Sequence, residues 1–374
     1  MKALPEWDNP SLAGNYPSWV YEFYQREKGS QKLLHKISKS KFLPIFIIEK
    51  INKRDFFPPE EIKKISRNYD LVFTSGKNII SALNFDIPVV FRSLGSDMAR
   101  LPFSCGNLYQ EALSYTLRKR IKKISCIIAQ QEDTIWSARF LGVLDKLRFF
   151  PIPVDIDDIN ANTDKDLLRK LNEKYSSYDH VFFLPARKVI NPNHSAYKGA
   201  EKFLKAFKKL KHKHKNIDIK VVSIMRGSGD GNFRRLIKSM QLEKYFDHIE
   251  GILPTYKLSA YMKIRNCVVF DDFGFTNKTH LTGISREALS VGAVVVDIVD
   301  TEYSHFKRLY RKNCPLLHAD DEEAIFKQME RIVSMDSNEL ENIRKRSISW
   351  AYKHLHWEKR IDELIDILEE HVEH

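Results

Sequence analysis

The stretch GISREALSVGAVVV, residues 283–296, decides the fold class. It predicts a helix that ends at Gly292 and an apolar strand that follows over 293–300. Glu287 is expected in the first turn of this helix, after Gly283. A carboxylate there can accept hydrogen bonds from the paired hydroxyls of a ribose, or it can simply offset the helix dipole. The residues alone leave both interpretations open.

Strands and helices alternate on both sides of this stretch, which predicts an α/β protein with parallel sheets. An extended, Pro-containing stretch over 147–160 separates two such series and is typical of a connection between domains. We therefore predict two doubly wound, Rossmann-like domains that face a cleft. The predicted strands are 41–51, 69–76, 87–97, 125–131, 180–187, 217–227, 248–253 and 267–273, and the predicted helices include 109–124, 133–142, 198–215 and 233–242.

Length and composition exclude several classes of protein. The chain has 374 residues, which suits two domains, and 43% of them are hydrophobic, which excludes disordered and fibrous proteins. Its four Cys residues form no C-x-x-C pair, so we expect reduced thiols rather than a disulfide scaffold or a Cys-rich zinc site. No apolar leader and no apolar run of about 18 residues occurs, so a soluble cytoplasmic protein is expected.

The net charge of +12 suggests a polyanionic partner, such as nucleic acid, an anionic membrane or phosphates. Residues 1–150 hold 24 Lys and Arg against 15 Asp and Glu (+9), and residues 151–374 hold 37 against 34 (+3). A basic cluster over 118–123 lies on the expected helix 109–124. We predict peripheral docking on the inner face of the cytoplasmic membrane rather than nucleic-acid recognition. An ordinary solvated helix face is the alternative.

Two cations and a glycine-rich turn follow the first two strands of the second series. Arg187 at a strand end and Lys198 at the start of the next helix suit a diphosphate, because the helix N-terminus adds partial positive charge. Gly227, in RGSGDG (226–231), lets the backbone approach a ligand closely. The alternatives are two solvated surface cations and a flexible turn. The 13 His residues show no metal-ligand spacing, so no metal site is expected.

Taken in order, these elements resemble the retaining family 4 glycosyltransferases, which have the GT-B architecture. The resemblance is clear over about residues 150–300, and PIPVD (151–155) is similar to the segment that joins the two domains in that family. The matching residues are Arg187, Lys198-Gly199, Gly227 and Gly229, Gly251-Ile252-Leu253, Asp271-Asp272 and Glu287-Ala288-Leu289-Ser290 with Gly292.

The resemblance implies an N-terminal acceptor domain over 1–155, a C-terminal nucleotide-sugar domain over 156–350, and a terminal helix over 351–374 that crosses back. It further implies roles for single residues. Arg187 and Lys198 would bind the donor diphosphate and act in catalysis, Glu287 would bind the ribose, and the backbone of Ile252 and Leu253 would contact the base. Gly227 and Gly283 would lie against the donor.

The chain departs from the family at the position of its first glutamate, which is Thr279 here. Asp271, Asp272 or His280 would replace the missing carboxylate at the donor sugar. In the first domain, FRSLGSDMARLPF (91–103) resembles the acceptor-side loop of the family. Asp97 is its candidate for contact with the acceptor nucleophile, and a helix N-cap is the alternative.

We therefore expect a retaining, metal-independent glycosyltransferase that uses a nucleotide-diphosphate sugar as substrate and needs no cofactor. Its acceptor would be a hydroxyl of a glycan or of a lipid-linked molecule. A sugar-nucleotide epimerase would need a pair of acid–base carboxylates in the first domain, which the sequence does not show. A degenerate, non-catalytic GT-B subunit or a basic nucleic-acid-binding protein is the remaining alternative.

Overall fold

The computed structural model describes residues 66–372 apart from 84, 104–107, 190–196, 228, 275–278 and 311–312. The predicted strand over 41–51 lies outside the described residues. The chain forms two compact units. Unit 1 comprises residues 1–150 and 366–374, and unit 2 comprises residues 151–365.

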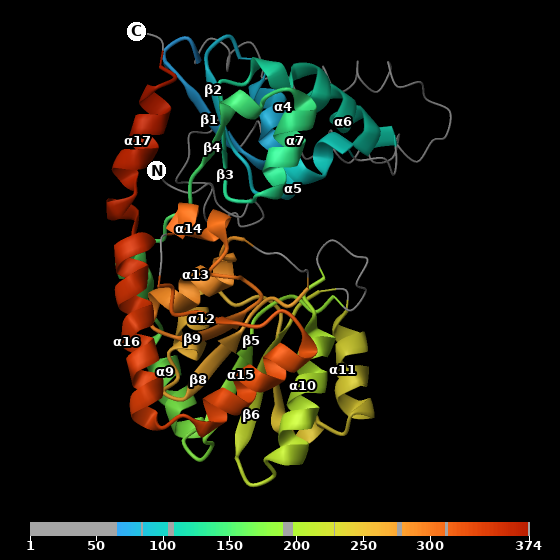
Figure 1. Ribbon diagram of the computed structural model, residues 1–374, viewed down its shortest axis with the longest axis vertical. Coiled ribbons are helices and arrows are strands. Elements are labelled where there is room, and N and C mark those ends of the chain that lie inside the picture. The colour runs from blue at the N-terminus through green and yellow to red at the C-terminus, as the bar shows by residue number, and fades with distance from the viewer. Residues whose placement is uncertain are drawn as a thin grey trace. The chain divides into compact units, whose positions relative to one another are not determined.

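The described part of unit 1 contains short strands and helices in alternation (Figure 1). Its strands are β1 (Val72–Ser75), β2 (Val89–Arg92), β3 (Cys126–Ala129) and β4 (Leu147–Phe149). Its α-helices are α4 (Ile79–Ala82), α5 (Ser96–Ala99), α6 (Leu108–Arg120) and α7 (Asp133–Leu141), and its 3-10 turns are η2 (Gly76–Asn78), η3 (Leu101–Phe103), η4 (Ile121–Lys123) and η5 (Leu144–Lys146).

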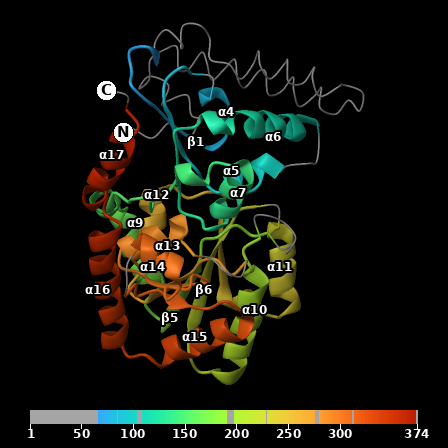
Figure 2. The same ribbon diagram turned by 45° about the horizontal axis from the view of Figure 1, so that its top comes forward.

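The four strands of unit 1 form one parallel sheet in the order β1-β2-β3-β4. Apolar side chains of α4, α6 and α7 pack with Val89, Phe91 and Ile127, and Figures 1 and 2 both draw these helices on one side of the sheet. Gly142 ends α7 with a φ of 69°, which confirms the predicted stop, because its N–H reaches the carbonyl of Ala138 in this left-handed conformation.

The described part of unit 2 contains six strands: β5 (His180–Leu184), β6 (Ile219–Met225), β7 (Phe246–Glu250), β8 (Cys267–Phe270), β9 (Val294–Asp297) and β10 (Leu317–His318). Its helices are α8 (Ile156–Ala161), α9 (Lys165–Lys174), α10 (Ala200–Lys213), α11 (Asp230–Ser239), α12 (Thr255–Met262), α13 (Gly283–Ser290), α14 (Ser304–Tyr310), α15 (Glu322–Ser334) and α16 (Ser337–His354). Two 3-10 turns, η6 (Glu243–Tyr245) and η7 (Trp357–Lys359), and a last helix, α17 (Ile361–Glu369), complete the described elements; α17 contains the boundary between the units at 365/366.

The sheet of unit 2 is parallel, with the strand order β10-β9-β8-β5-β6-β7. This is the doubly wound order in which the chain starts in the middle, adds two strands on one side and then crosses to the other. Figure 1 shows α10, α11 and α15 over one face and α9, α12, α13 and α16 toward the other. The predicted α/β class with two parallel sheets is confirmed.

Aromatic rings fill the core between the sheet of unit 2 and α10. The Phe182 ring lies 4.8 Å from that of Phe270 and 6.1 Å from that of Phe207, and all three are fully buried. Each such side chain contributes about 1.5–3 kcal/mol by leaving water. This core holds the carboxyl ends of β5 and β8 side by side, and the loops that follow these strands carry most of the predicted donor residues.

The strands of unit 2 are shorter than predicted. The predicted strand 180–187 ends at Leu184, and the predicted strand 217–227 ends at Met225. The cations that were expected at strand ends therefore lie in the following loops, where the backbone is free to turn. The stretch PIPVD is anchored at Val154, which pairs with His356 in an isolated parallel bridge.

Candidate functional site

Several of the predicted donor residues of unit 2 follow two neighbouring strands of its sheet. In a doubly wound sheet, ligands bind outside the carboxyl ends of the strands where the strand order reverses. Here the order reverses between the neighbours β5 and β8. Arg187 follows β5, and Asp271 and Asp272 follow β8.

Lys198 and Asp272 form an ion pair at this point. The Lys198 ammonium donates to Oδ2 of Asp272, whose side chain is fully buried and whose Oδ1 accepts a hydrogen bond from Gly274 N at 2.9 Å. A buried carboxylate needs such partners, because desolvation without them is costly. The sequence placed both residues at the donor, and the structure shows that they contact each other.

Two glycines make this ion pair possible. Gly199 has a φ of 63°, and a Cβ atom on it would lie 2.3 Å from the carbonyl oxygen of Phe273. A Cβ atom on Gly274 would lie 2.1 Å from the carbonyl oxygen of Tyr197. The two backbones therefore touch, and the Phe273 N–H donates to the Lys198 carbonyl at 3.0 Å. Any larger side chain at either glycine would separate Lys198 from Asp272.

Arg226 adds a cation that the sequence analysis did not single out. It is partly buried directly after β6, and burial lowers the pKa of its guanidinium, with further lowering from the nearby exposed Arg187. The charges of Asp271 and Glu287 oppose this shift. The sequence did contain a signal for Arg226. It directly follows β6, as Arg187 follows β5, and the carboxyl ends of parallel strands share one edge of the sheet.

The glycine-rich turn after β6 folds over the backbone of Lys188. The Gly229 N–H donates to the Lys188 carbonyl at 2.9 Å, and Gly227 has a φ of 129°, with its Cβ position 3.0 Å from the same oxygen. Position 227 therefore requires a glycine for two reasons: a Cβ atom would crowd the Lys188 carbonyl, and the backbone is in the left-handed region. A contact of Gly227 with a donor stays a prediction.

Lys188 itself is buried, in contrast to its exposed neighbour Arg187. Its ammonium donates to the carbonyls of Leu184 at 3.0 Å and Ala186 at 2.6 Å, and it lies 5.4 Å from the centre of the Phe233 ring. Burial lowers the pKa of Lys188 to about 7. This value already includes a smaller lowering by the charge of Arg226 and the opposing effect of the carboxylates Asp230 and Asp271.

Glu287 lies deeper in its helix than predicted. The helix α13 begins at Gly283 instead of 285, because the Thr282 hydroxyl caps it by accepting from Ser285 N at 3.0 Å. Glu287 therefore lies in the second turn, and its predicted place in the first turn is wrong. Since the effect of the helix dipole fades beyond the first turn, offsetting that dipole no longer explains this carboxylate.

The Glu287 carboxylate also lacks local partners. Within the part of the chain that the structure describes, it accepts no hydrogen bond and forms no ion pair within 4.0 Å. Burial raises its pKa, Asp271 raises it further, and the cations Arg286 and Arg226 oppose the shift. A partly buried acceptor with unused lone pairs beside cations is suited to bind a ligand that carries hydroxyl groups.

A buried network joins the start of α13 to two strand ends. Oδ2 of Asp271 accepts hydrogen bonds from the Thr282 hydroxyl and from the Ser285 hydroxyl, the latter at 3.1 Å. The Ser285 hydroxyl also contacts Oδ2 of the buried Asp297, the last residue of β9. Asp271 therefore positions α13, and with it Glu287, rather than facing open solvent.

The remaining predicted donor residues are placed less closely. Ile252 follows the turn at Gly251 after β7, has 71% of its surface exposed, and is followed by the half-buried Leu253. Thr279 is buried and His280 is half-buried, next to residues 275–278 outside the described part. Among the described residues, no hydrogen bond or ion pair joins Glu287 to any of these, and their roles at a base or a sugar stay predictions.

Asp97 lies in unit 1 and holds its own loop. Its Oδ1 accepts from the Ser93 hydroxyl at 2.7 Å, from Gly95 N at 3.1 Å and from Met98 N at 2.8 Å. Its Oδ2 accepts from Leu94 N at 2.9 Å. The loop thus occupies both oxygens of this buried carboxylate. Asp97 lies inside α5 (Ser96–Ala99) and accepts mainly from residues before it, so it holds the loop without being the N-cap of the helix. A catalytic contact of Asp97 stays a prediction.

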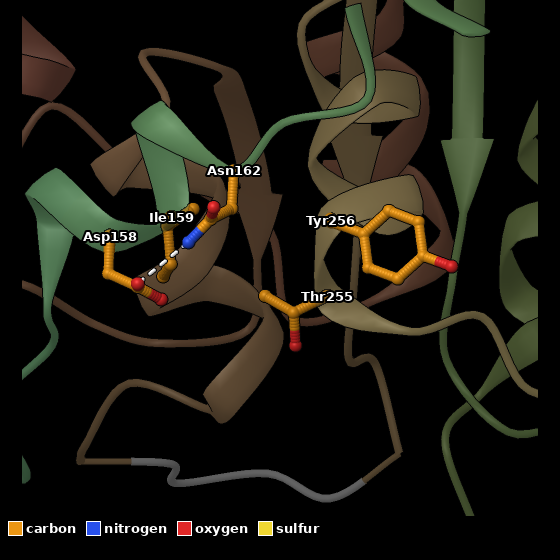
Figure 3. A pocket seen from close by; sticks show the side chains of 5 residues that line it. All are labelled: Asp158, Ile159, Asn162, Thr255 and Tyr256. Atoms are coloured by element: carbon orange, nitrogen blue, oxygen red, sulfur yellow. Dashed lines mark hydrogen bonds between the residues drawn. The ribbon is translucent and has the colours of Figure 1, made fainter.

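Two hollows of unit 2 lie outside the predicted residues. A pocket of 360 Å³ lies between α8 and the first turn of α12, lined by Asp158, Ile159, Asn162, Thr255 and Tyr256 (Figure 3). Figure 3 shows the Asn162 amide bonded to Asp158, at 2.7 Å, and the Tyr256 ring on the opposite side. A groove of 1080 Å³ lies at the amino ends of β5 and β8 and includes His180 and Arg344. The groove lies at the end of the sheet opposite Glu287.

The described residues contain no group of three or more His, Cys, Asp or Glu side chains arranged to hold a metal ion. None of the described helices combines the length and the apolar character that crossing a bilayer requires.

Comparison with known proteins shows the fold. No protein-family model and no curated protein matches the sequence. Among solved structures, Anabaena HepE in complex with UDP and glucose has a TM-score of 0.58 at 13% identity, over 83% of this chain and 81% of that one. Trehalose-6-phosphate synthase from Burkholderia multivorans has a TM-score of 0.61 at 12% identity, over 86% and 76%. A Rickettsia africae glycosyltransferase has a TM-score of 0.56 at 14% identity, over 88% and 83%.

The chain has the GT-B fold. Identities of this size establish the fold and leave the family unassigned.

Proposed function

We propose that this protein is a glycosyltransferase that moves a sugar from a nucleotide-diphosphate donor to a hydroxyl of a glycan or of a lipid-linked acceptor. The observation that carries the proposal is Glu287, a partly buried carboxylate without a local partner, on the helix that follows β8 at the reversal point of the sheet; the charge of Arg226 acts on its pKa. The solved structures of the same fold include HepE in complex with UDP and glucose and a glycosyltransferase, which supports the class of donor and reaction.

Glu287 would bind the ribose. One carboxylate can accept hydrogen bonds from two neighbouring hydroxyls, and burial strengthens both bonds. The backbone of Ile252 and Leu253 would contact the base, and Gly227, Gly283 and His280 would lie against the rest of the donor. Binding would also compensate the cost of burying this charge, which its raised pKa reflects.

The cations Arg187, Arg226 and Lys198 would bind the diphosphate. In the reaction, the bond from the sugar C1 to the diphosphate oxygen breaks, and its electron pair leaves with the diphosphate. The acceptor oxygen forms the new bond to C1, and its proton is released to the departing diphosphate or to water. Cations held in place by the fold stabilise the charge that develops on the leaving group.

Asp272 is a positioning residue in this scheme. It holds Lys198 through their ion pair, and the tight contact at Gly199 and Gly274 maintains that geometry. An ammonium has three N–H donors, so Lys198 would contact a bound diphosphate and keep its bond to the buried Asp272. The ion pair would thus position the cation before the donor binds.

Retention of configuration and independence of metal are part of the proposal. Three cations can offset the charge of a diphosphate, so the donor would not need a divalent ion. The resemblance to family 4 supports retention. An anomeric assignment of the product by NMR and an assay in excess EDTA test these two points separately.

A degenerate, non-catalytic subunit is the second candidate, because Thr279 is buried and brings no carboxylate to the donor sugar. Such a protein would keep nucleotide binding and lose transfer. Mass spectrometry of donor sugars incubated with the protein separates the candidates. Transfer or slow hydrolysis of one donor supports the enzyme, and tight binding without either supports the subunit.

The decisive test measures binding of UDP, GDP, ADP, CDP and dTDP by calorimetry and thermal shift. We expect one nucleotide to bind, and Glu287→Gln and Arg187→Ala each to weaken it at least tenfold, since each loses a charge-assisted contact. Glu173→Gln and Arg169→Ala are matched controls, because these residues pair only with each other on the exposed side of α9. Absence of binding for every nucleotide would overturn the proposal, and so would equal effects of the site and control variants.

A further inference from the structure

Unit 1 exposes three large aromatic side chains on one surface. Trp136 and Phe140 lie one turn apart on α7, with 69% and 70% of their surfaces exposed. Phe103, at the end of η3, is 39% exposed, and its ring lies 5.2 Å from that of Phe140 in an edge-to-face contact. We call these three residues the aromatic surface. Exposed apolar clusters of this kind usually mark a contact with a partner or a membrane.

The aromatic surface is next to cations. The Arg139 guanidinium lies 5.4 Å from the centre of the Trp136 ring, on the same exposed side of α7. The Lys122 side chain lies beside Gly142, which ends α7. Lys146 secures the turn before β3 by donating to the carbonyl of Lys122 at 2.7 Å. The end of α7 therefore joins the aromatic rings to the basic cluster over 118–123.

The basic cluster is itself exposed. Arg118, Lys119, Lys122 and Lys123 all face solvent, and Lys119 lies 5.7 Å from the ring of Tyr115, which is half-exposed on α6. Two nearby acidic residues, Glu132 and Asp133, lie at the N-terminal end of α7, and a third, Asp145, lies in η5 after its C-terminal end. Arg139 and the basic cluster outnumber Asp145 at the C-terminal end, which leaves that end basic.

We propose that the aromatic surface docks on a membrane that contains anionic phospholipids. Trp136, Phe140 and Phe103 would enter the interface between headgroups and acyl chains, where aromatic rings are favoured, and their exposed apolar surface would leave water. Arg139 and the basic cluster would contact the headgroups, at about 1 kcal/mol for each cation near an anionic surface. These cations favour an anionic lipid surface over a second copy of the chain as the binding partner, because two copies of this basic face would repel each other.

This proposal deepens the acceptor part of the proposed function, because it would bring the protein to a lipid-linked acceptor. Membrane binding is measured without donor or acceptor. The two proposals can therefore be refuted independently. A protein that binds nucleotide but no vesicles contradicts only the membrane proposal, and one that binds vesicles but no nucleotide contradicts only the proposed function.

The test is co-sedimentation of the full chain with vesicles of phosphatidylcholine alone or mixed with 30% phosphatidylglycerol. We expect binding to the anionic vesicles, at least tenfold weaker binding to the neutral ones, and weakening in high salt. The double variant Trp136→Ser/Phe140→Ser should bind at least tenfold more weakly. Tyr69→Ser, which changes another strongly exposed aromatic residue of unit 1 (61% exposed), should bind as the wild type does.

A second measurement keeps the test independent of folding defects. Brominated lipids quench tryptophan that enters the bilayer, so quenching should fall in Trp136→Phe, which keeps an apolar ring and the fold. Unchanged binding of the double variant, or unchanged quenching in Trp136→Phe, would overturn the proposal. A wild-type dimer that the double variant converts to a monomer, with no vesicle binding by either, would overturn it in favour of a second copy of the chain.

Discussion

Asp97 in unit 1 and Glu287 in unit 2 are carboxylates on short helices that follow a parallel strand, yet their surroundings are opposite. Asp97 accepts four hydrogen bonds from residues 93–98, so its own loop uses its acceptor capacity. Glu287 is partly buried and bonds to none of the described residues around it. An acidic residue that stabilises its own loop serves the fold, whereas one that is desolvated without partners lowers stability and has to be explained by a ligand.

Among the substitutions, removal of the Asp97 carboxylate should cause the largest loss of stability. Asp97→Ala removes the acceptor for Leu94 N, Gly95 N and the Ser93 hydroxyl. Because each buried unsatisfied donor costs about 1–3 kcal/mol, the free energy of unfolding should fall by about 3 kcal/mol. Urea unfolding measures this loss, and hydrogen exchange should show faster opening over 93–98.

Two variants serve as controls for Asp97→Ala. Asp97→Asn keeps one acceptor oxygen and should lose roughly half as much, while Asp86→Ala changes an exposed acidic residue of the same unit and should lose almost nothing. If Asp97→Ala keeps full stability but abolishes sugar transfer, then Asp97 contacts the acceptor and the comparison is wrong.

Lys188 extends the comparison to cations, since its ammonium is buried and bonded to backbone carbonyls, whereas Arg187 beside it is exposed. Its pKa is about 7 in the folded chain against an ordinary value near 10.5. Between these values the unfolded chain binds a proton that the folded chain does not. Stability should therefore decrease as pH falls from 10.5 to 7, by about 1.4 kcal/mol per pH unit, and should change no further from this group below pH 7.

Lys188→Met tests this pH dependence, because it keeps the length of the side chain and removes the titrating group. The free energy of unfolding of the wild type minus that of the variant should show the slope, as measured by urea unfolding between pH 7 and 10. Lys208→Met, at an exposed position of α10, should show no such slope. A parallel pH dependence in wild type and Lys188→Met would mean that Lys188 stays charged in the folded chain. The groups that face Lys188 are Arg226, Asp230, Asp271 and His248, and all of them remain in the variant.

Local chemistry explains which parts of the fold could be predicted. Gly142 and Gly292 were expected to end helices, and both have positive φ values, 69° and 76°. The alternation of apolar strands with amphipathic helices was sufficient for the two parallel sheets, since each element shows its period within ten residues. Strand ends were predicted about three residues too long. Pro185 after β5, Gly251 after β7 and Asp271 after β8 are residue types that disfavour strands, and they mark the earlier ends.

Contacts between distant segments explain what could not be predicted. Lys198 and Asp272 were both placed at the donor, but their ion pair depends on a backbone contact between Gly199 and Gly274, 75 positions apart. Which of the neighbours Arg187 and Lys188 is buried follows from the turn at Gly227 folding over Lys188. Residue types indicate which groups could act in such a site, and only the packing decides which of them remain available.

The smallest effect on stability should come from Glu287→Gln, and it should have the opposite sign to that of Asp97→Ala. Burial raises the pKa of Glu287, so its folded form binds a proton more readily than the unfolded chain does. Its contribution to stability is fully present below its ordinary pKa and is lost as pH rises through the raised value, which leaves a buried charge at neutral pH. Glu287→Gln removes that charge, so the variant should be as stable as the wild type or slightly more stable at pH 7.5, and this difference should shrink toward pH 4. A clear loss of stability at pH 7.5 would show that Glu287 serves the fold as Asp97 does, and the comparison would no longer support a ligand at α13.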